Sequence, residues 1–525
     1  MSSLARTPCD EGVIRAATPP EAAGCPDRDK PWVLAATILG SSIAFIDGSV
    51  VSVALPVMQA ELATTVRGAQ WIVNAYMLLL GALILVGGGT GDRFGRRRVF
   101  TVGLAVFAAA SVGCGLAPDV ATLIVMRAAQ GVGGALLVPS SLAIVSAAFP
   151  EGERGRAIGT WAGFSALTTA LGPVLGGWLV DAWSWRAIFF INVPLAALAV
   201  SIARARVPES RAPGAGPVDW RGGLLATLGL AGLAYGLTAA SERGWTDPVV
   251  LAALAGGVLV LAGFVAHERR APAPMMPVEL FRSRTFSGAN GMTLLLYFAL
   301  SGALFFLPFN LIQVQGYSAA LAGAALLPFT LIMGGLSRWS GGLIDRYGAR
   351  TPLVAGSMIA AAGLALLAVP GIGGSYWTTF FPATAVLGFG MAVAVAPLTT
   401  AVMSAVDEVH AGVASGINNA VARVAGLLAV ALLGAVAVGA FGAALDERAA
   451  ALGVRAEHRQ ALAAQASRLA EAELPADAAG VERERLERAV DEAFVQSFRV
   501  VMLITAAAAL GSAVCARVTV PPQAR

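Results

Sequence analysis

Two ionisable side chains, Asp47 and Arg127, lie inside long apolar stretches of the sequence, at 32–58 and 120–148. A charge at the centre of a bilayer costs about 2.5–3.5 kcal/mol on insertion scales, so each needs a partner, water or a function. If the first stretch crosses outward and the other inward, a rise of about 1.5 Å per residue puts them roughly 16 Å and 10 Å below one face. We therefore expect the two side chains to meet, directly or through water. Our hypothesis is that Asp47 carries a proton and that Arg127 tunes its proton affinity; the alternative is a fixed structural ion pair.

A second charged pattern occurs twice, 253 positions apart. The copies are Asp92-Arg93-Phe94-Gly95-Arg96-Arg97 and Asp345-Arg346-Tyr347-Gly348-Ala349-Arg350. Each copy follows a glycine-containing apolar stretch and precedes another apolar run, which indicates an internally duplicated membrane protein. Duplicated halves that rock about a central site are a common plan of transporters. The plainer interpretation of these arginines is positive charge that only sets topology.

The composition indicates which elements must position these residues. Of 525 residues, 57% are hydrophobic and 13% charged, against roughly a quarter charged in soluble domains. A span needs about 20 mainly apolar residues. The sequence contains about fourteen such runs, at 32–58, 70–88, 99–117, 120–148, 157–181, 186–203, 222–241, 248–266, 286–314, 319–344, 351–370, 375–405, 410–440 and 494–516. The runs are too long for barrel strands, so we predict an all-α integral membrane protein.

The distribution of basic residues predicts the orientation of the chain. With the N-terminal tail inside, the tails and cytoplasmic loops hold 22 Lys and Arg residues, whereas the short outer loops hold Arg67, Arg186 and Arg243. This asymmetry satisfies the positive-inside rule with both termini cytoplasmic. The net charge of +4 is then a topology signal, and no nucleic-acid partner is needed to explain it.

Two segments fall outside the apolar runs. Residues 1–31 are polar and carry no signal-peptide pattern, so we expect a disordered cytoplasmic tail. Residues 441–493 should lie outside and hold eleven acidic and seven basic residues. Apolar residues recur there at helical spacing, which predicts two short amphipathic helices broken near Pro475. A solvated spacer is an equally open interpretation, and the four cysteines of the chain indicate neither a disulfide framework nor a zinc site.

Five motifs occur in one order along the first half. They lie at Ile46–Pro56, Gly88–Arg97, Leu123–Ala135, Gly159–Gly177 and Trp185–Pro194. With them, the sequence resembles the major facilitator superfamily, in its fourteen-span drug:proton antiporter branch. Two positions depart from the motifs, with Thr90 where leucine is usual and Thr168 where a glycine is usual.

The resemblance implies roles for three groups of residues. The first is a latch that holds one conformation and breaks in the other, at Gly88, Asp92, Arg93, Gly95, Arg97, Asp345, Arg346, Gly348 and Arg350. The second is an antiporter hinge that seals against proton leak, at Gly159, Gly172, Pro173, Gly176 and Gly177. Its glycines and proline also favour bending and close helix approach on their own, and ordinary small-residue packing is the alternative.

The third group is a candidate substrate cavity between the halves. Its members are polar or aromatic residues within the apolar runs: Asn74, Phe164, Asn290, Tyr297, Phe305, Gln313, Asn419 and Arg423. Taken singly, such residues are more often packing or lipid-facing surface. A cavity of this character favours bulky, amphipathic, often cationic compounds.

The resemblance implies two pseudo-symmetric six-helix bundles plus two extra central helices, about 14 transmembrane helices in all. The expected parts are 1–31, the tail; 32–206, the first bundle; 207–270, two linker helices; 271–440, five helices of the second bundle; 441–493, an extracytoplasmic loop; and 494–525, the last helix and tail. The sequence contains no GxxxxGK[ST] motif, so coupling to a gradient is the simpler source of energy.

We therefore expect a proton-coupled exporter of lipophilic small molecules in the bacterial inner membrane, with no cofactor, metal or catalytic residue. A dedicated exporter of one metabolite, self-made antibiotic or lipid is the alternative within transport. An intramembrane enzyme or sensor is disfavoured, because the sequence lacks HExxH, a metal-spaced histidine cluster and a nucleophile motif. The expected partners are a small-molecule substrate, protons and the bilayer. A periplasmic adaptor is conceivable but nothing in the sequence requires it.

Overall fold

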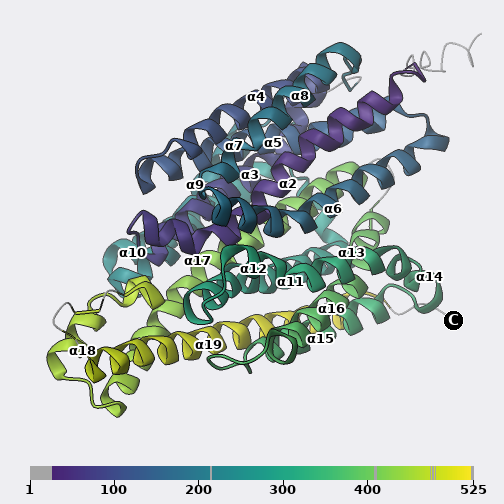
Figure 1. Ribbon diagram of the computed structural model, residues 1–525. Helices are drawn as coiled ribbons and strands as arrows, with labels where there is room; N and C mark the ends of the chain where they lie inside the picture. The colour runs from purple at the N-terminus through teal and green to yellow at the C-terminus, as the bar shows by residue number, and fades with distance from the viewer. Residues whose placement is uncertain are drawn as a thin grey trace, which may run out of the picture.

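The computed structural model describes residues 26–212, 216–406, 411–472, 474, 475, 478 and 480–521. The expected tail 1–31 therefore lies outside the described residues except at its end. Every regular element of the described chain is helical. Figure 1 shows two layers, with the first half of the chain (purple to blue) above the second half (green to yellow).

The first half forms one bundle of helices. These are α2 (Lys30–Glu61), α3 (Val66–Phe94), α4 (Arg96–Gly115), α5 (Val120–Ala148), α6 (Glu151–Ala182), and α7 (Ala187–Phe190), which leads into α8 (Asn192–Arg206).

The second half forms the other bundle. Its elements are η1 (Val278–Arg282), α11 (Arg284–Phe309), η2 (Asn310–Val314), α12 (Ala319–Ala324), α13 (Leu327–Gly341), α14 (Leu343–Tyr347), α15 (Arg350–Leu367), α16 (Tyr376–Ser404), α17 (Ala411–Ala451), α18 (Ala456–Ala463), η4 (Ala466–Glu471) and α19 (Val481–Thr519).

The prediction of an all-helical protein with many membrane spans is confirmed. Among the described residues, 13 helices are long and apolar enough to cross a membrane. Helix α6 adds a shorter apolar stretch, Leu171–Ala182, within its 32 residues. The protein is thus an all-α integral membrane protein with about fourteen spans, each satisfying its own backbone hydrogen bonds as a bilayer demands.

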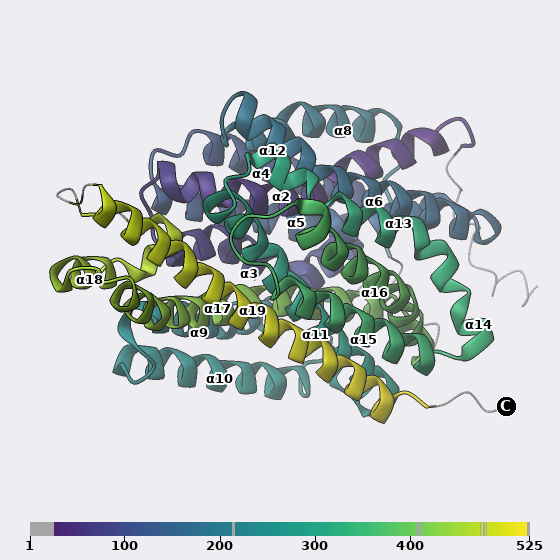
Figure 2. The same ribbon diagram turned by 60° about the horizontal axis from the view of Figure 1, so that its bottom comes forward.

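The two extra helices are central in the sequence but peripheral in space. Helix α9 (Trp220–Arg243) packs on α3 and α17, and α10 (Pro248–Glu268) packs on α9. In Figure 2, α10 lies along the lower edge of the molecule with α9 between it and α17. The apolar side chains Val258 and Leu259 of α10 are exposed on this edge, as expected for a helix that faces lipid.

The two ends of the bundle differ in what they carry. We call "tail face" the end where α2 begins and α19 ends, and "loop face" the opposite end, where α18 and η4 connect α17 to α19. In Figure 1 the tail face lies to the right and the loop face to the left.

The predicted pair of short helices in 441–493 is wrong in its boundaries. Helix α17 continues to Ala451, and α19 begins at Val481 and runs without interruption into the last span. Among the described residues of this segment, the short α18 and the 3-10 turn η4 lie between the two long helices, and the expected break near Pro475 lies in the connection before α19. The apolar stripe that includes Leu486 and Phe494 is buried in the main core cluster, which favours one long helix over two short ones.

Candidate functional site

The structure brings Asp47 and Arg127 together. Asp47 comes from the middle of α2 and Arg127 from α5, and each side chain is only 1% exposed. The Nη1 atom of Arg127 lies 2.5 Å from Oδ2 of Asp47. Their depth below a common face, which follows from the rise of a helix, was enough to predict this contact.

A polar network surrounds the ion pair. Gln130 accepts from Arg127 Nη1 at 2.7 Å and donates to Asp47 Oδ1 at 3.2 Å and to Ser111 Oγ at 2.7 Å. Asn192 Nδ2 lies 3.5 Å from the same carboxylate oxygen. All five residues are buried. The sequence reasoning missed the role of Gln130, although its position three residues after Arg127 puts it on the same helix face.

The guanidinium of Arg127 has contacts that do not depend on Asp47. Its Nε donates to the carbonyl of Ile72 at 3.1 Å, and Gln130 accepts a second bond. The ring of Tyr76 lies 4.4 Å and that of Phe189 5.8 Å from the guanidinium carbon. Cation–π contacts of this kind contribute about 2 kcal/mol when desolvated.

The buried charge of Arg127 does not depend on Asp47 alone for compensation. Removing one partner of a buried ion pair ordinarily costs about 3–5 kcal/mol, because the other charge is left uncompensated. Here Arg127 keeps two hydrogen bonds and two aromatic faces when Asp47 is neutral, which reduces that cost. The protein therefore holds the guanidinium of Arg127 partly independently of Asp47.

The glycines of α6 are sites of close helix contact. A Cβ at Gly172 would collide with Ser49, and one at Gly176 with Val50, both on α2. A Cβ at Gly177 would collide with the carbonyl of Ala319, where α12 of the second half begins. The predicted hinge segment therefore touches α2 on one side and the second half on the other.

The same contact is tight from the side of α12. A Cβ at Gly323 would collide with the carbonyl of Pro173, so neither backbone leaves room for a side chain there. Gly159 lies in α6, and its surroundings are not among those described.

An acidic residue that the sequence reasoning missed closes this contact. Asp181, near the end of α6, accepts from the backbone N–H of Ala319 at 3.1 Å and of Ala320 at 2.8 Å. A carboxylate at a helix N-terminus satisfies free donors and interacts favourably with the helix dipole. Its signal in the sequence is an acid four residues after the last glycine of the hinge segment.

Two glutamines also join the halves near the loop face. Gln59 donates to the carbonyl of Arg468 at 2.9 Å, and Gln70 donates to that of Val430 at 2.5 Å. Among the described residues, Gln59, Gln70 and Asp181 make the hydrogen bonds that join the two halves. All three lie near the loop-face ends of their helices. The structure is therefore closed at the loop face.

The first copy of the repeated pattern forms a turn between α3 and α4. Gly95 has a φ of +115°, a conformation that favours glycine. Asp92 pairs with Arg96, at 2.8 Å, and the backbone N–H of Arg96 donates to the carbonyl of Ser210 at 2.9 Å. The partner of Asp92 is thus Arg96, which was not among the expected latch residues.

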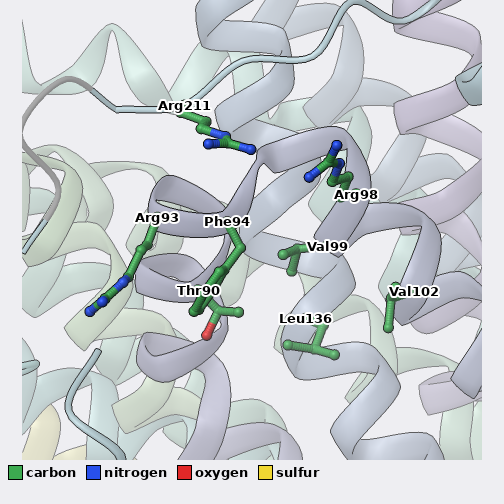
Figure 3. Close-up of a pocket in the computed structure, with 8 residues that line it drawn as sticks. All are labelled: Thr90, Arg93, Phe94, Arg98, Val99, Val102, Leu136 and Arg211. Atoms are coloured by element: carbon green, nitrogen blue, oxygen red, sulfur yellow. The ribbon is translucent and has the colours of Figure 1, made fainter. Parts of the chain in front are cut away.

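The expected Arg93 lies elsewhere. It lines a cavity of about 320 Å³ with Phe94, Arg98 and Arg211. Figure 3 shows Arg93 on the far side of Phe94 from Arg98. Its guanidinium carbon lies 5.5 Å from the centre of the Phe94 ring. In this conformation Asp92 is paired with Arg96, and the latch role of Arg93 stays a prediction.

Glu209 is the main acidic partner of this turn, and the sequence reasoning missed it. Its Oε1 accepts from the backbone N–H of Arg97 at 3.0 Å, and its Oε2 lies 3.7 Å from Arg97 Nε. Its carboxylate also lies against Gly95. An acid in an otherwise basic loop after the sixth span was the available signal.

The structure predicts a stabilising role for Glu209 that is testable by substitution. Glu209→Gln keeps the size of the side chain but removes its charge. Hydrogen bonds to charged groups contribute about 1.5–3 kcal/mol, so we expect a lower midpoint of thermal unfolding in detergent. Glu279→Gln, at an exposed acid of the same face, is the matched control. Equal midpoints for the two variants would contradict this role.

The second copy of the pattern is described only in part. Gly348 has a φ of +69°, and Arg350 begins α15, as the repeat predicts. Arg346 is exposed, and the side chain of Asp345 lies outside the described residues. Gly88 in the first copy lies against Pro139 of α5.

The candidate cavity residues fall into different environments. Phe305 is 3% exposed and packs with Phe306 and Phe309, so it is a core residue in this conformation. Asn290 is buried and accepts from Asn418 at 3.3 Å. Phe164 is 49% exposed.

The remaining members also differ in their surroundings. Asn419 is exposed, and Tyr297 is half-buried on α11. Arg423 lies against Gly81 at the contact of α17 with α3. Gln313 in η2 is hydrogen-bonded to Glu471, whereas Asn74 on α3 has side-chain amide atoms that are buried without a described partner. Amide groups in that state are available to a bound polar ligand.

Comparisons with known proteins agree on one family. A family model described as Major Facilitator Superfamily matches residues 37–430. The multidrug resistance protein Stp of Mycobacterium tuberculosis (strain CDC 1551 / Oshkosh) is 36% identical over 421 residues, which cover 80% of this chain and 78% of that protein. The tetracenomycin C resistance and export protein of Streptomyces glaucescens is 37% identical, covering 78% and 76%.

Two further similarities extend this picture. The puromycin resistance protein pur8 of Streptomyces alboniger is 37% identical, covering 82% of this chain and 87% of that protein. The solved structure of a bacterial homologue of the human lysosomal transporter Spinster has a TM-score of 0.65 at 17% identity, covering 94% of this chain and 98% of that one. At that identity the likeness concerns the fold alone.

Proposed function

This chain belongs to the Major Facilitator Superfamily, and from that premise we propose that it is a proton-coupled antiporter. Its substrates are lipophilic drugs or antibiotics, including cationic ones, which it exports by alternating access. The observation that carries the proposal is the buried pair of Asp47 and Arg127, in which Arg127 also donates to Gln130.

The relatives support the substrate class. Their names include resistance to puromycin, export of tetracenomycin C and multidrug resistance. Such compounds are large and partly apolar, and a site between two helical halves suits ligands of that kind. The unpartnered amide of Asn74 is our candidate for a polar contact with them.

We propose the following cycle. With the loop face closed, Asp47 is ionised and paired with Arg127, and substrate enters from the tail face. Opening of the loop face separates α6 from α12, releases substrate outward and exposes the carboxyl to protons. Return to the closed state carries the proton inward. There Asp47 releases the proton and pairs with Arg127 again. The two ligands use the carrier alternately, which is antiport.

The energy of one proton is sufficient for useful export. A charge that moves through about 100 mV releases about 2.3 kcal/mol. At an assumed potential of about 150 mV this is about 3.5 kcal/mol, which supports roughly 300-fold accumulation of substrate.

The proposed location is the bacterial inner membrane with both termini cytoplasmic. The tail face then corresponds to the cytoplasm, where the arginine-rich turn at Arg96 and the linker with Glu209 lie. On this assignment the parts of the chain are the two bundles at 32–206 and 271–440 with 494–525, joined by the pair at 207–270. The positive-inside rule supports the orientation.

A dedicated exporter of one antibiotic is the second candidate. It is favoured by the relatives whose names give a single compound, such as tetracenomycin C and puromycin. A panel of unrelated lipophilic cations and antibiotics distinguishes the two, because a dedicated exporter should respond to one member only.

Proton release on substrate addition tests the proposed function. Purified protein in weakly buffered detergent should acidify the solution when a substrate from the panel is added. Substrate binds the state in which Asp47 is ionised, so its binding draws protonated carrier into that state and releases protons. The same protein mixed with a panel compound that it does not export is the control. Binding of an exported compound without any proton release at any pH would contradict antiport.

A further inference from the structure

Two buried carboxyl groups meet at the tail-face end of the α9–α10 pair. Asp219 is the N-cap residue of α9, and Glu268 is the last residue of α10. The side chain of Asp219 is 8% exposed and Glu268 is 3% exposed. Neither residue belongs to the Asp47 network, and both are far from it along the chain.

Each carboxyl group has one partnered oxygen. Asp219 Oδ1 accepts from the backbone N–H of Gly222 at 2.9 Å and lies 2.9 Å from Nε2 of His267. Glu268 Oε2 accepts from the backbone N–H of Met276 at 2.8 Å. Met276 belongs to the segment that leads from α10 into the second half.

The other oxygen of each group is buried without a hydrogen-bond partner. These atoms are Asp219 Oδ2 and Glu268 Oε1. A Cβ built on Gly222 would lie 2.5 Å from the first and 2.6 Å from the second, so both oxygens border the same small gap. Asp219 Oδ2 and Glu268 Oε1 are therefore two hydrogen-bond acceptors at one gap, with no donor placed between them.

A shared proton supplies that donor. Two buried carboxylates at close range cannot both be ionised without a large cost, so one of them binds a proton. Burial would raise the pKa of Asp219, but the N–H of Gly222 and the ring of His267 more than offset it and hold this pKa below its ordinary value. Asp219 is then the anion, and Glu268 is the acid that donates to it.

A metal ion fits the site less well than a proton. Among the described residues, no group of three or more His, Cys, Asp and Glu side chains is placed to hold a metal. The nitrogen of His267 that faces the pair already contacts Asp219 Oδ1. Only two oxygens remain, which is fewer than the ligands that hard cations collect in proteins.

We propose that Asp219 and Glu268 bind one proton between them, and that this proton fastens the α9–α10 pair to the segment 271–276 that enters the second half. We call this arrangement the carboxyl clasp. Because Glu268 also holds the backbone of Met276, its ionisation acts directly on that connection. The clasp is a second proton site, outside the proposed transport path.

The clasp has access to water at the tail face. A cavity of about 710 Å³ there is lined by Glu268 together with Arg269, Glu279 and Arg282. His267 is the titratable group in contact with the pair, and Arg221, Arg269 and Arg270 are exposed neighbours along the same two helices. Protons can therefore exchange with the tail-face solution, which is the cytoplasm if the proposed orientation holds.

The sign of the pH dependence follows from the shared proton. When the proton is bound, Glu268 donates to Asp219 and the clasp is closed. Loss of the proton as pH rises places two negative charges side by side, and their repulsion loosens the connection at Met276. The clasp is thus closed at low pH and opens as pH rises.

Hydrogen exchange of the full-length protein tests the proposal. After correction for the intrinsic chemical rate, amide exchange in 271–283 should accelerate with pH, by up to about tenfold per pH unit for release of one proton. Glu268→Gln, whose amide can donate to Asp219 as the acid does, should abolish this acceleration. Glu279→Gln, at the rim of the same cavity, should keep it. An unchanged pH dependence in the Glu268 variant would overturn the proposal.

Infrared spectroscopy gives a second readout, whose main observation is made on the wild-type protein. The wild-type protein should lose the carbonyl band of one buried carboxylic acid as pH is raised, and this loss should be missing in Glu268→Gln. Absence of such a band in the wild type would overturn the proposal, as would binding of Ca²⁺ or Mg²⁺ that depends on Glu268. Neither measurement requires transport, so failure of the antiport proposal would leave this test unaffected.

Discussion

Replacing Asp47 with asparagine is expected to abolish proton-driven accumulation of substrate while the protein remains inserted and folded. Asparagine has nearly the same shape, and its one acceptor oxygen can keep the hydrogen bond from Arg127 while that from Gln130 is given up. It cannot bind and release a proton. Arg127 retains the carbonyl of Ile72 and the ring of Tyr76, so the network should survive. The roughly 300-fold gradient that one proton supports should collapse to none.

Proteoliposomes separate this effect from loss of binding. With an imposed pH gradient, the Asp47→Asn variant should show no uphill transport, whereas exchange of labelled for unlabelled substrate across the membrane should persist. Asp119→Asn is the matched control, because Asp119 is an exposed carboxylate that caps α5 and asparagine also caps helices. Undiminished uphill transport by Asp47→Asn would end the proposal that this residue carries the proton.

Adding a branched side chain at Gly177 is also expected to reduce transport strongly. In Gly177→Val the new side chain would meet the backbone carbonyl of Ala319, which cannot move without shifting the whole of α12. The loop face should then fail to close. Since alternating access requires both states, we expect transport to fall at least about tenfold, which corresponds to a penalty of about 1.4 kcal/mol on the closed state.

The conformational cause is measurable as well as the rate. Spin labels at the loop-face ends of α6 and α12 should give a longer distance in Gly177→Val than in the wild type. Gly263→Val makes the same change in α10 at a position with open space, and it should transport normally. A wild-type distance and rate in Gly177→Val would show that this close contact is not required.

The membrane spans and the central ion pair were predictable because both depend on simple periodic geometry. Apolar runs of about 20 residues have few alternatives to spanning helices. The depth of Asp47 and Arg127 follows from counting residues along such helices. Contacts between the ends of distant helices do not follow from counting, which is why Asp181 and Glu209 were missed.

The pairing of Asp92 also depends on a local turn. Gly95, with a φ of +115°, separates α3 from α4 and brings Arg96 back to Asp92, a contact that counting residues along one helix does not give. The latch role of Asp92 and Arg93 stays a prediction. The break predicted in 441–493 underestimated α19. Its apolar stripe at Leu486 and Phe494 continues into Phe498, so the period itself indicated one helix.

The length of α17 and α19 has a mechanical consequence. With 41 and 39 residues, each extends about 60 Å, roughly twice the hydrocarbon thickness of a bilayer. Both belong to the second half, and the polypeptide at their tips touches the first half through Gln59. They therefore form a stiff lever, so that a small tilt of one half within the lipid becomes a wide sideways swing above the membrane surface.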